Sequence, residues 1–202
     1  VIDAKGLMVA PGFINPHSHI DQTILKNPDA EASLMQGVTT EIVGVDGLSV
    51  IDFARHFDEL SKKGTGLNYG SLVGQGSVRQ AVKGNSIGAA TATEIASMQG
   101  LVKKAMEQGA LGLSTGLEYV PGVYTATDEI IELAKAASPY EGVYVSHIRN
   151  ERDKVLEAVR EALEIAKAAK LTAVISHIKV GSSVYDTSRE QIIAKNTAEV
   201  IA

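Results

Sequence analysis

The chain has 202 residues, of which 45% are hydrophobic and 21% charged, and its formal net charge is −5 at pH 7. This length suits one domain with a sizeable core, or a large part of a bigger one. The negative charge and the absence of a long basic run argue against nucleic acid or an anionic membrane as the main partner. No stretch approaches the roughly 20 apolar residues of a membrane span.

The chain contains no Cys, which excludes disulfides and thiolate metal sites within it. It begins Val1-Ile2-Asp3 rather than with Met, so the lack of a signal peptide carries little weight. We expect a cytoplasmic protein.

Short apolar, β-branched runs alternate with helical patterns along the chain. The runs that predict strands span residues 12–20, 39–45, 68–76, 110–115, 142–148 and 171–178. The patterns that predict helices span residues 52–63, 91–108, 127–138 and 151–170. Thr91 or Thr93 is the expected N-cap of the second helix. The last helix has an apolar stripe made of Val155, Ala158, Val159, Ala162, Leu163, Ile165 and Ala166.

This alternation predicts an α/β fold with a parallel sheet, because strands that are apolar throughout are typical of sheets covered on both faces. The strand starts are spaced like those of a (β/α)8 barrel of about 250 residues. "YVSHIRNE" (144–151) and "VISHIKVG" (174–181) also share Ser-His-Ile followed by a cation. A doubly wound open sheet fits the alternation equally well. It does not explain why polar residues gather at so many carboxyl ends of strands, which form the active face of a barrel.

Six strands cannot close an eight-stranded barrel, so we expect a fragment of a longer enzyme. Residues 1–10 are predicted to end a flanking small β-domain, and residues 11–202 to form an incomplete barrel that stops in the helix after the sixth strand.

Four of the five histidines occupy equivalent places in this scheme. His17 and His19, in "NPHSHID", stand two apart on a predicted strand and therefore point to the same face, where two imidazoles can share one divalent metal. Alternatively, one caps a neighbour and the other is exposed. His147 and His177 end the fifth and sixth strands, which favours convergence on one metal site. His56 lies in a predicted helix and is expected at the surface.

Several other polar residues follow the predicted strands. Asp46, in "GVDG", is either a turn residue or a carboxylate that ligates metal. Asp21 is either a loop acid or a carboxylate that orients an imidazole. Lys179 and Arg149 each stand two residues after a histidine, and either could hold a substrate carboxylate or pair with a loop acid.

The segments "APGFINPHSHID", "GVTTEIVGVDGLS", "GALGLSTGLEYVPG", "SHIRNE" and "SHIK" together resemble the amidohydrolase superfamily. More narrowly they resemble its N-acyl-D-amino-acid deacylase (D-aminoacylase) branch, over about residues 6–180. The resemblance implies a metal-dependent (β/α)8 TIM barrel with a small β-domain. It also implies Zn²⁺, as one or two divalent ions, that activates a water for attack on the amide of a small N-acylated amino acid.

The resemblance assigns roles to particular residues. His17, His19, His147 and His177 would be metal ligands, while Lys179 and Tyr119 would hold the substrate carboxylate and polarise the scissile carbonyl. Asp46 stands where the branch has Cys, so it is a plausible ligand that is harder than the thiolate it replaces. The chain also has Asn15 and Gln75 where Asp and His are usual.

Alternatives remain open at this stage. A cyclic amidase of the dihydroorotase or hydantoinase type commonly carries a carboxylated Lys on strand four, where this chain has Ser114-Thr115. A deaminase or a non-catalytic metal-binding relative are the other candidates. The general base of the family, an Asp on strand eight, is expected beyond Ala202.

Overall fold

The computed structural model describes residues 2–181 of the protein, which form parallel strands in chain order with helices between them. The strands pair as β1-β2-β3 and β4-β5-β6-β7, and every pair is parallel. Leu72 alone separates β3 from β4, and Leu111 N–H donates to Ser71 O across the break, so the two sheets follow one another. The strands are β1 (Phe13–Asn15), β2 (Val38–Val43), β3 (Asn68–Ser71), β4 (Val73–Gly74), β5 (Gly112–Gly116), β6 (Val143–His147) and β7 (Thr172–Ile175).

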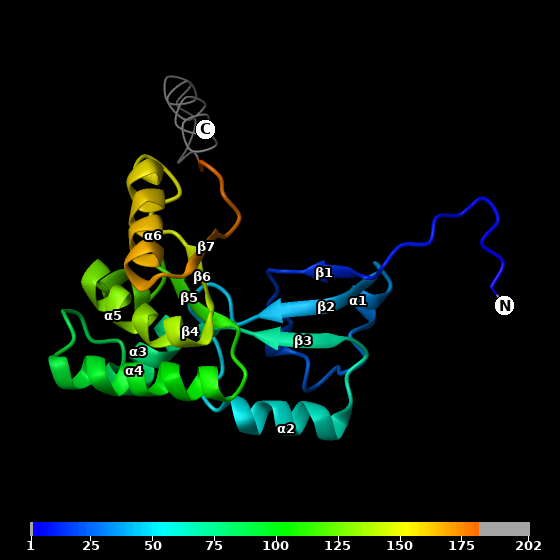
Figure 1. The fold of residues 1–202 in the computed structure, drawn as a ribbon, viewed down its shortest axis with the longest axis horizontal. Helices are drawn as coiled ribbons and strands as arrows, with labels where there is room; N and C mark the ends of the chain where they lie inside the picture. The colour runs from blue at the N-terminus through cyan, green and yellow to red at the C-terminus, as the bar shows by residue number, and fades with distance from the viewer. Residues whose placement is uncertain (1, 182–202) are drawn as a thin grey trace.

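The helices lie outside these strands. In Figure 1, α3 to α6 flank β4–β7 on one side, and α2 lies below β3. Parallel strands in sequential order with helices on the outer face form part of an α/β barrel, which confirms the predicted fold class. The helices are α1 (Glu31–Leu34), α2 (Phe53–Lys63), α3 (Gln75–Lys83), α4 (Ala92–Glu107), α5 (Thr127–Ala137) and α6 (Val155–Ala169), with 3-10 turns at Ile20–Gln22, Gly122–Tyr124 and Ser138–Tyr140.

Strand β6 shows how the sheet separates two cores. Successive side chains of a strand point to opposite faces. Tyr144 therefore packs among the helices in the main hydrophobic cluster, whereas Val145 contacts Val45 and Leu72 on the other face. His147 shares the face of Val145, so the strand aims its imidazole at the inside of the barrel.

Three of the predicted strands are clearly too long at their carboxyl ends, and this is a correction. The first ends at Asn15 because Pro16 has no N–H to continue the ladder. The third ends at Gly74, and α3, which was not predicted, begins at Gln75. The sixth ends at Ile175, two residues before His177.

The predicted helices lie close to the observed ones. Thr91 is the N-cap of α4, and with Glu94 it forms a capping box. α6 begins at Val155 rather than at 151, because Asn150 Oδ1 accepts hydrogen bonds from the N–H groups of Arg152 and Lys154 and holds a turn there. Leu163 was placed in the apolar stripe of α6, but its side chain is 51% exposed.

The prediction that His56 lies at the surface is wrong. His56 shares the inner face of α2 with Phe53 and Leu60, and it is buried. Its Nε2 lies 3.0 Å from the hydroxyl of Tyr69 on β3, which gives the buried imidazole a polar partner.

Residues 2–10 contain no helix or strand, and most of their side chains are exposed. The predicted division of the chain, with the end of a flanking β-domain at residues 1–10 and the incomplete barrel at residues 11–202, stays a prediction. The helix expected after the sixth strand lies outside the described residues. No helix within residues 2–181 is both long and apolar enough to cross a membrane.

Candidate metal site

Polar side chains from separate loops meet at the carboxyl ends of the strands. His17 and His19 follow β1, Asp46 follows β2, His147 ends β6, and His177 follows β7. The structure therefore brings together the five residues that the sequence singled out as metal ligands. Their role as ligands remains a proposal.

Asp46 lies at the centre of this cluster. One carboxylate oxygen, Oδ2, lies 3.3 Å from His17 Nε2 and 3.2 Å from His19 Nε2. The other oxygen, Oδ1, lies 3.5 Å from His177 Nε2 and 3.8 Å from His147 Nδ1. The two latter nitrogens are 3.1 Å apart. A single carboxylate thus faces one pair of imidazoles with each of its oxygens.

The donor atoms fit one or two divalent ions. His17, His19 and Asp46 form one group, and Asp46, His147 and His177 form a second, with the ligand atoms of each group within 4.8 Å of one another. Asp46 Oδ1 is buried without a hydrogen-bond partner, which is costly for a carboxylate that binds nothing. Imidazole nitrogens with a carboxylate oxygen suit Zn²⁺.

Burial favours the neutral form of His17 and His147, whose ring lone pairs can then bind a metal. Burial lowers the pKa of His17, and the neighbouring rings of His177 and His19 add to this effect, whereas Asp46 opposes it. Burial likewise lowers the pKa of His147, against the opposing carboxylates of Glu151 and Asp46.

Neither His17 nor His19 lies on a strand, so their predicted alternation is wrong even though both reach Asp46. Asn15 Oδ1 accepts a hydrogen bond from His17 N–H at 3.2 Å and turns the chain after β1. His19 is the N-cap of the following 3-10 turn. A local turn, rather than the pleat of a strand, therefore sets the spacing of the two rings.

The turn that carries Asp46 is fitted closely between strand ends. Asp46 has a left-handed backbone, with φ of 54°, and lies between Gly44 and Gly47, which also have positive φ. Ser114 on β5 donates to the carbonyl oxygen of Gly44, and its hydroxyl accepts from Gly47 N–H at 3.2 Å. A Cβ at Gly116 would collide with the carbonyl oxygen of Asp46.

Tyr119 and Lys179 border the cluster. The hydroxyl of Tyr119 lies 3.3 Å from His147 Nδ1. Burial, and secondarily the carboxylate of Asp46, raises the pKa of Tyr119, so the phenol stays protonated and can donate. Lys179 Nζ pairs with the carboxylate of Glu151 and lies 3.2 Å from His177 Nδ1.

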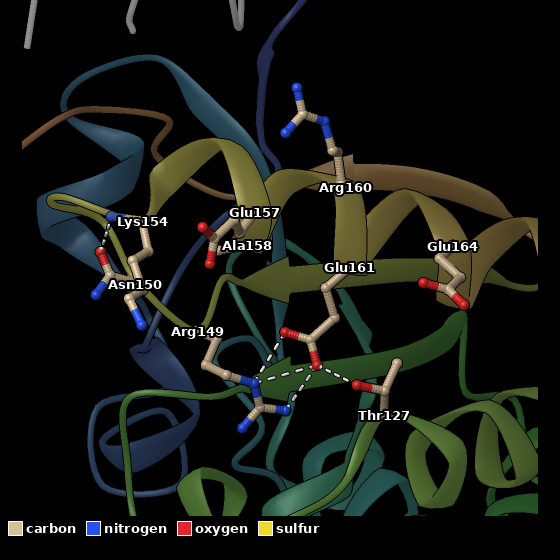
Figure 2. A pocket seen from close by; sticks show the side chains of 9 residues that line it. All are labelled: Thr127, Arg149, Asn150, Lys154, Glu157, Ala158, Arg160, Glu161 and Glu164. Carbon is tan, nitrogen blue, oxygen red and sulfur yellow. Dashed lines mark hydrogen bonds and ion pairs between the residues drawn. The ribbon is translucent and has the colours of Figure 1, made fainter.

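Arg149 is engaged away from the cluster. Its guanidinium donates to both carboxylate oxygens of Glu161 on α6, at 2.8–3.1 Å, and to the carbonyl oxygens of Val123 and Thr125. Figure 2 shows this pair, with Thr127 on the same carboxylate, at the wall of a cavity of about 630 Å³ outside α6. Arg149 therefore pairs with an acid of a helix rather than with the loop acid predicted for it, and it ties the Val123–Thr125 segment to α6.

The remaining candidates, Asp21 and Gln75, make no hydrogen bond to the cluster within residues 2–181. Asp21 makes no hydrogen bond to an imidazole within residues 2–181, and burial raises the pKa of its carboxyl. Gln75 is buried and donates from Nε2 to Thr125 Oγ1 at 2.9 Å.

Sequence reasoning missed Ser114, Glu118 and Glu151. Nothing in the pattern marked Ser114 as the residue that holds the Asp46 turn. Glu151 ends the "SHIRNE" segment, and its place four residues after His147 was the available signal.

These features define the class of protein: part of an α/β barrel of the amidohydrolase type, with polar side chains gathered at the strand ends. The model of the amidohydrolase family matches residues 1–199, and the chain belongs to this family.

The comparisons with individual proteins narrow the resemblance. The chain is 34% identical to D-aminoacylase from Alcaligenes xylosoxydans xylosoxydans, over 95% of this chain and 44% of that protein. It superimposes with a TM-score of 0.83, at 29% identity, on a solved D-aminoacylase described for its binuclear metal center. The TM-score is 0.82, at 32% identity, for N-acyl-D-glutamate deacylase from Bordetella bronchiseptica complexed with zinc and a phosphonate inhibitor. Both structural matches cover 95% of this chain and 45% of the other. The chain thus spans less than half the length of these relatives.

Proposed function

We propose that the protein is a zinc-dependent hydrolase that cleaves the linear amide of N-acyl-D-amino acids. The observation that carries this proposal is the Asp46 carboxylate, which faces two imidazoles with each of its oxygens. The relatives, which are deacylases of N-acyl-D-amino acids, support the substrate class.

In this proposal His17, His19, Asp46, His147 and His177 hold one or two divalent ions. Zinc bound there would polarise the amide carbonyl and lower the pKa of the attacking water. Burial lowers the pKa of His17 and His147, and Asp46 Oδ1 has no hydrogen-bond partner within residues 2–181, so these donors keep lone pairs for the ion.

Two further side chains are proposed to act on the substrate. Tyr119 donates a hydrogen bond to the carbonyl oxygen as negative charge develops on it, since its phenol remains protonated. Lys179, which pairs with Glu151 in the structure, pairs with the carboxylate of the substrate when the substrate binds. We assign transfer of the water proton to no residue within 2–181.

A cyclic amidase is the less favoured hydrolase. The position on β5 that a carboxylated lysine would need is occupied by Ser114, which already donates and accepts within the Asp46 turn. The chain therefore has no lysine at this position that could be carboxylated and bridge two ions.

The test is hydrolysis by the zinc-loaded, full-length protein, measured as release of free amino acid from N-acetyl-D-leucine, N-acetyl-D-aspartate and N-acetyl-D-glutamate and their L-enantiomers. We expect release from at least one D-substrate and little from its L-form, and loss of that activity in His177→Ala. Turnover of dihydroorotate, hydantoin or adenine alone would contradict the proposal. Zinc binding without any turnover would instead support a non-catalytic relative.

A further inference from the structure

Glu151 contacts two candidate site residues at once. It follows β6 in the loop before α6, and its side chain is only 10% exposed. Its Oε1 lies 2.8 Å from His177 Nδ1, and its Oε2 pairs with Lys179 Nζ. One carboxylate therefore joins the outer nitrogen of an imidazole at the cluster to the cation beside it.

The backbone of Glu151 is fixed on both sides. Its N–H donates to Glu118 Oε1 at 3.3 Å, in the loop after β5. Its carbonyl oxygen accepts from Gly181 N–H at 2.6 Å, in the segment after β7. Glu151 thus connects the loops that follow three adjacent strands, and its own position leaves the carboxylate little freedom.

The two nitrogens of His177 have different surroundings. Nε2 faces Asp46 and His147 inside the cluster, whereas Nδ1 faces Glu151. An imidazole that binds a metal through one nitrogen carries its proton on the other, and a carboxylate there fixes both the tautomer and the ring orientation. When Nδ1 carries the proton, Lys179 cannot donate a hydrogen bond to that nitrogen. Lys179 can then pair with Glu151 or with a bound substrate.

A similar arrangement lies behind the neighbouring histidine, at a longer distance. His147 turns Nδ1 toward Asp46, and its Nε2 is buried 3.8 Å from Glu118 Oε2. Neither carboxylate forms a hydrogen bond to its imidazole within residues 2–181, but Glu151 Oε1 lies 2.8 Å from His177 Nδ1, whereas Glu118 Oε2 lies 3.8 Å from His147 Nε2. The shorter distance identifies Glu151 as the better placed of the two carboxylates.

We propose that Glu151 is a positioning residue that orients His177 for metal binding and holds Lys179 beside the cluster. This inference rests on the proposed function, because it assigns His177 and Lys179 the roles given there. It predicts that one substitution changes both metal affinity and substrate binding.

The experiment compares Glu151→Gln with the wild type as full-length proteins. Zinc affinity is measured by competition with a chromophoric chelator, and kcat and KM with an N-acyl-D-amino acid. Glutamine keeps the size of the side chain, but it is uncharged and has only one acceptor oxygen. It therefore cannot accept hydrogen bonds from both His177 and Lys179 through separate oxygens. We expect zinc affinity 10- to 100-fold weaker and a raised KM. Glu157→Gln, on the exposed first turn of α6, is the matched control and should leave both unchanged.

Lys179→Met separates the two effects, since it should raise KM and leave zinc affinity as in the wild type. Unchanged zinc affinity in folded Glu151→Gln would overturn the proposal. A measurement that needs no variant is ¹⁵N NMR of the histidines in the zinc-loaded wild type. It should show a protonated His177 Nδ1, and an unprotonated Nδ1 would also overturn the proposal. Zinc affinity is measured without substrate, so a protein that cleaves no N-acyl amino acid would refute only the proposed function.

Discussion

At the scale of single residues, Asp46 differs from a cysteine in a way that affects the whole cluster. A thiolate offers one soft donor atom, whereas a carboxylate offers two hard oxygens that can face different ions. Here Oδ2 faces the histidines after β1, and Oδ1 faces those of β6 and β7. The carboxylate of Asp46 therefore lies between the two halves of the site.

Tyr119 is the residue whose proposed role can be separated from metal binding. Its hydroxyl lies 3.3 Å from His147 Nδ1, and its raised pKa keeps it a donor at neutral pH. Tyr119→Phe removes only this hydroxyl. We expect kcat to fall about 100-fold, the loss typical of one oxyanion donor, with zinc content unchanged. Zinc analysis beside steady-state kinetics checks this, and equal kcat in the variant would remove Tyr119 from the mechanism.

At the scale of elements, the turn after β2 that carries Asp46 is held by close backbone contacts and by one short side chain. Gly47 and Gly116 let the turn after β2 lie directly against the end of β5, and Ser114 bonds to both sides of that turn. The position of Asp46 therefore depends on a strand that contributes no ligand of its own.

Gly116→Ala tests this dependence. The added methyl group would lie 2.0 Å from the carbonyl oxygen of Asp46, so the backbone of one of the two segments would have to shift. We expect the free energy of unfolding to fall by about 1–3 kcal/mol, with weaker zinc binding. Denaturant unfolding and zinc competition measure the two effects.

Gly100→Ala is the control for that substitution. Gly100 lies within α4 with open space where a Cβ would stand, so alanine should stabilise the protein by about 0.5–1 kcal/mol. Equal effects of the two substitutions would mean that the contact at Gly116 is not tight.

At the scale of the whole molecule, the sequence was sufficient for the alternation of strands and longer helices and for the five residues that meet around Asp46, although α1 and α3 were not predicted. Apolar runs and amphipathic helices produce strong periodic signals, and carboxyl ends of parallel strands converge by topology alone. His147 is the simplest case, because the alternation of β6 aims it inward beside Val145.

Other features depend on contacts that no local pattern contains. The burial of His56 requires Tyr69 from β3. By contrast, the early end of the first strand follows from a local feature, the turn at Asn15–Pro16. Glu151 and Ser114 act across loops that are distant in sequence, so neighbouring letters give little sign of either role.

The central claim is that residue 46 ligates a metal shared with the four histidines, and cobalt spectroscopy of Asp46→Cys tests it most directly. Cobalt(II) bound by a thiolate gains a sulfur-to-metal charge-transfer absorption that nitrogen and oxygen ligands do not give. We predict this band in the cobalt-loaded variant, relative to the wild type, and its absence in Asp58→Cys, an exposed acid of α2. Cobalt-loaded Asp46→Cys with the spectrum of the wild type would contradict the account.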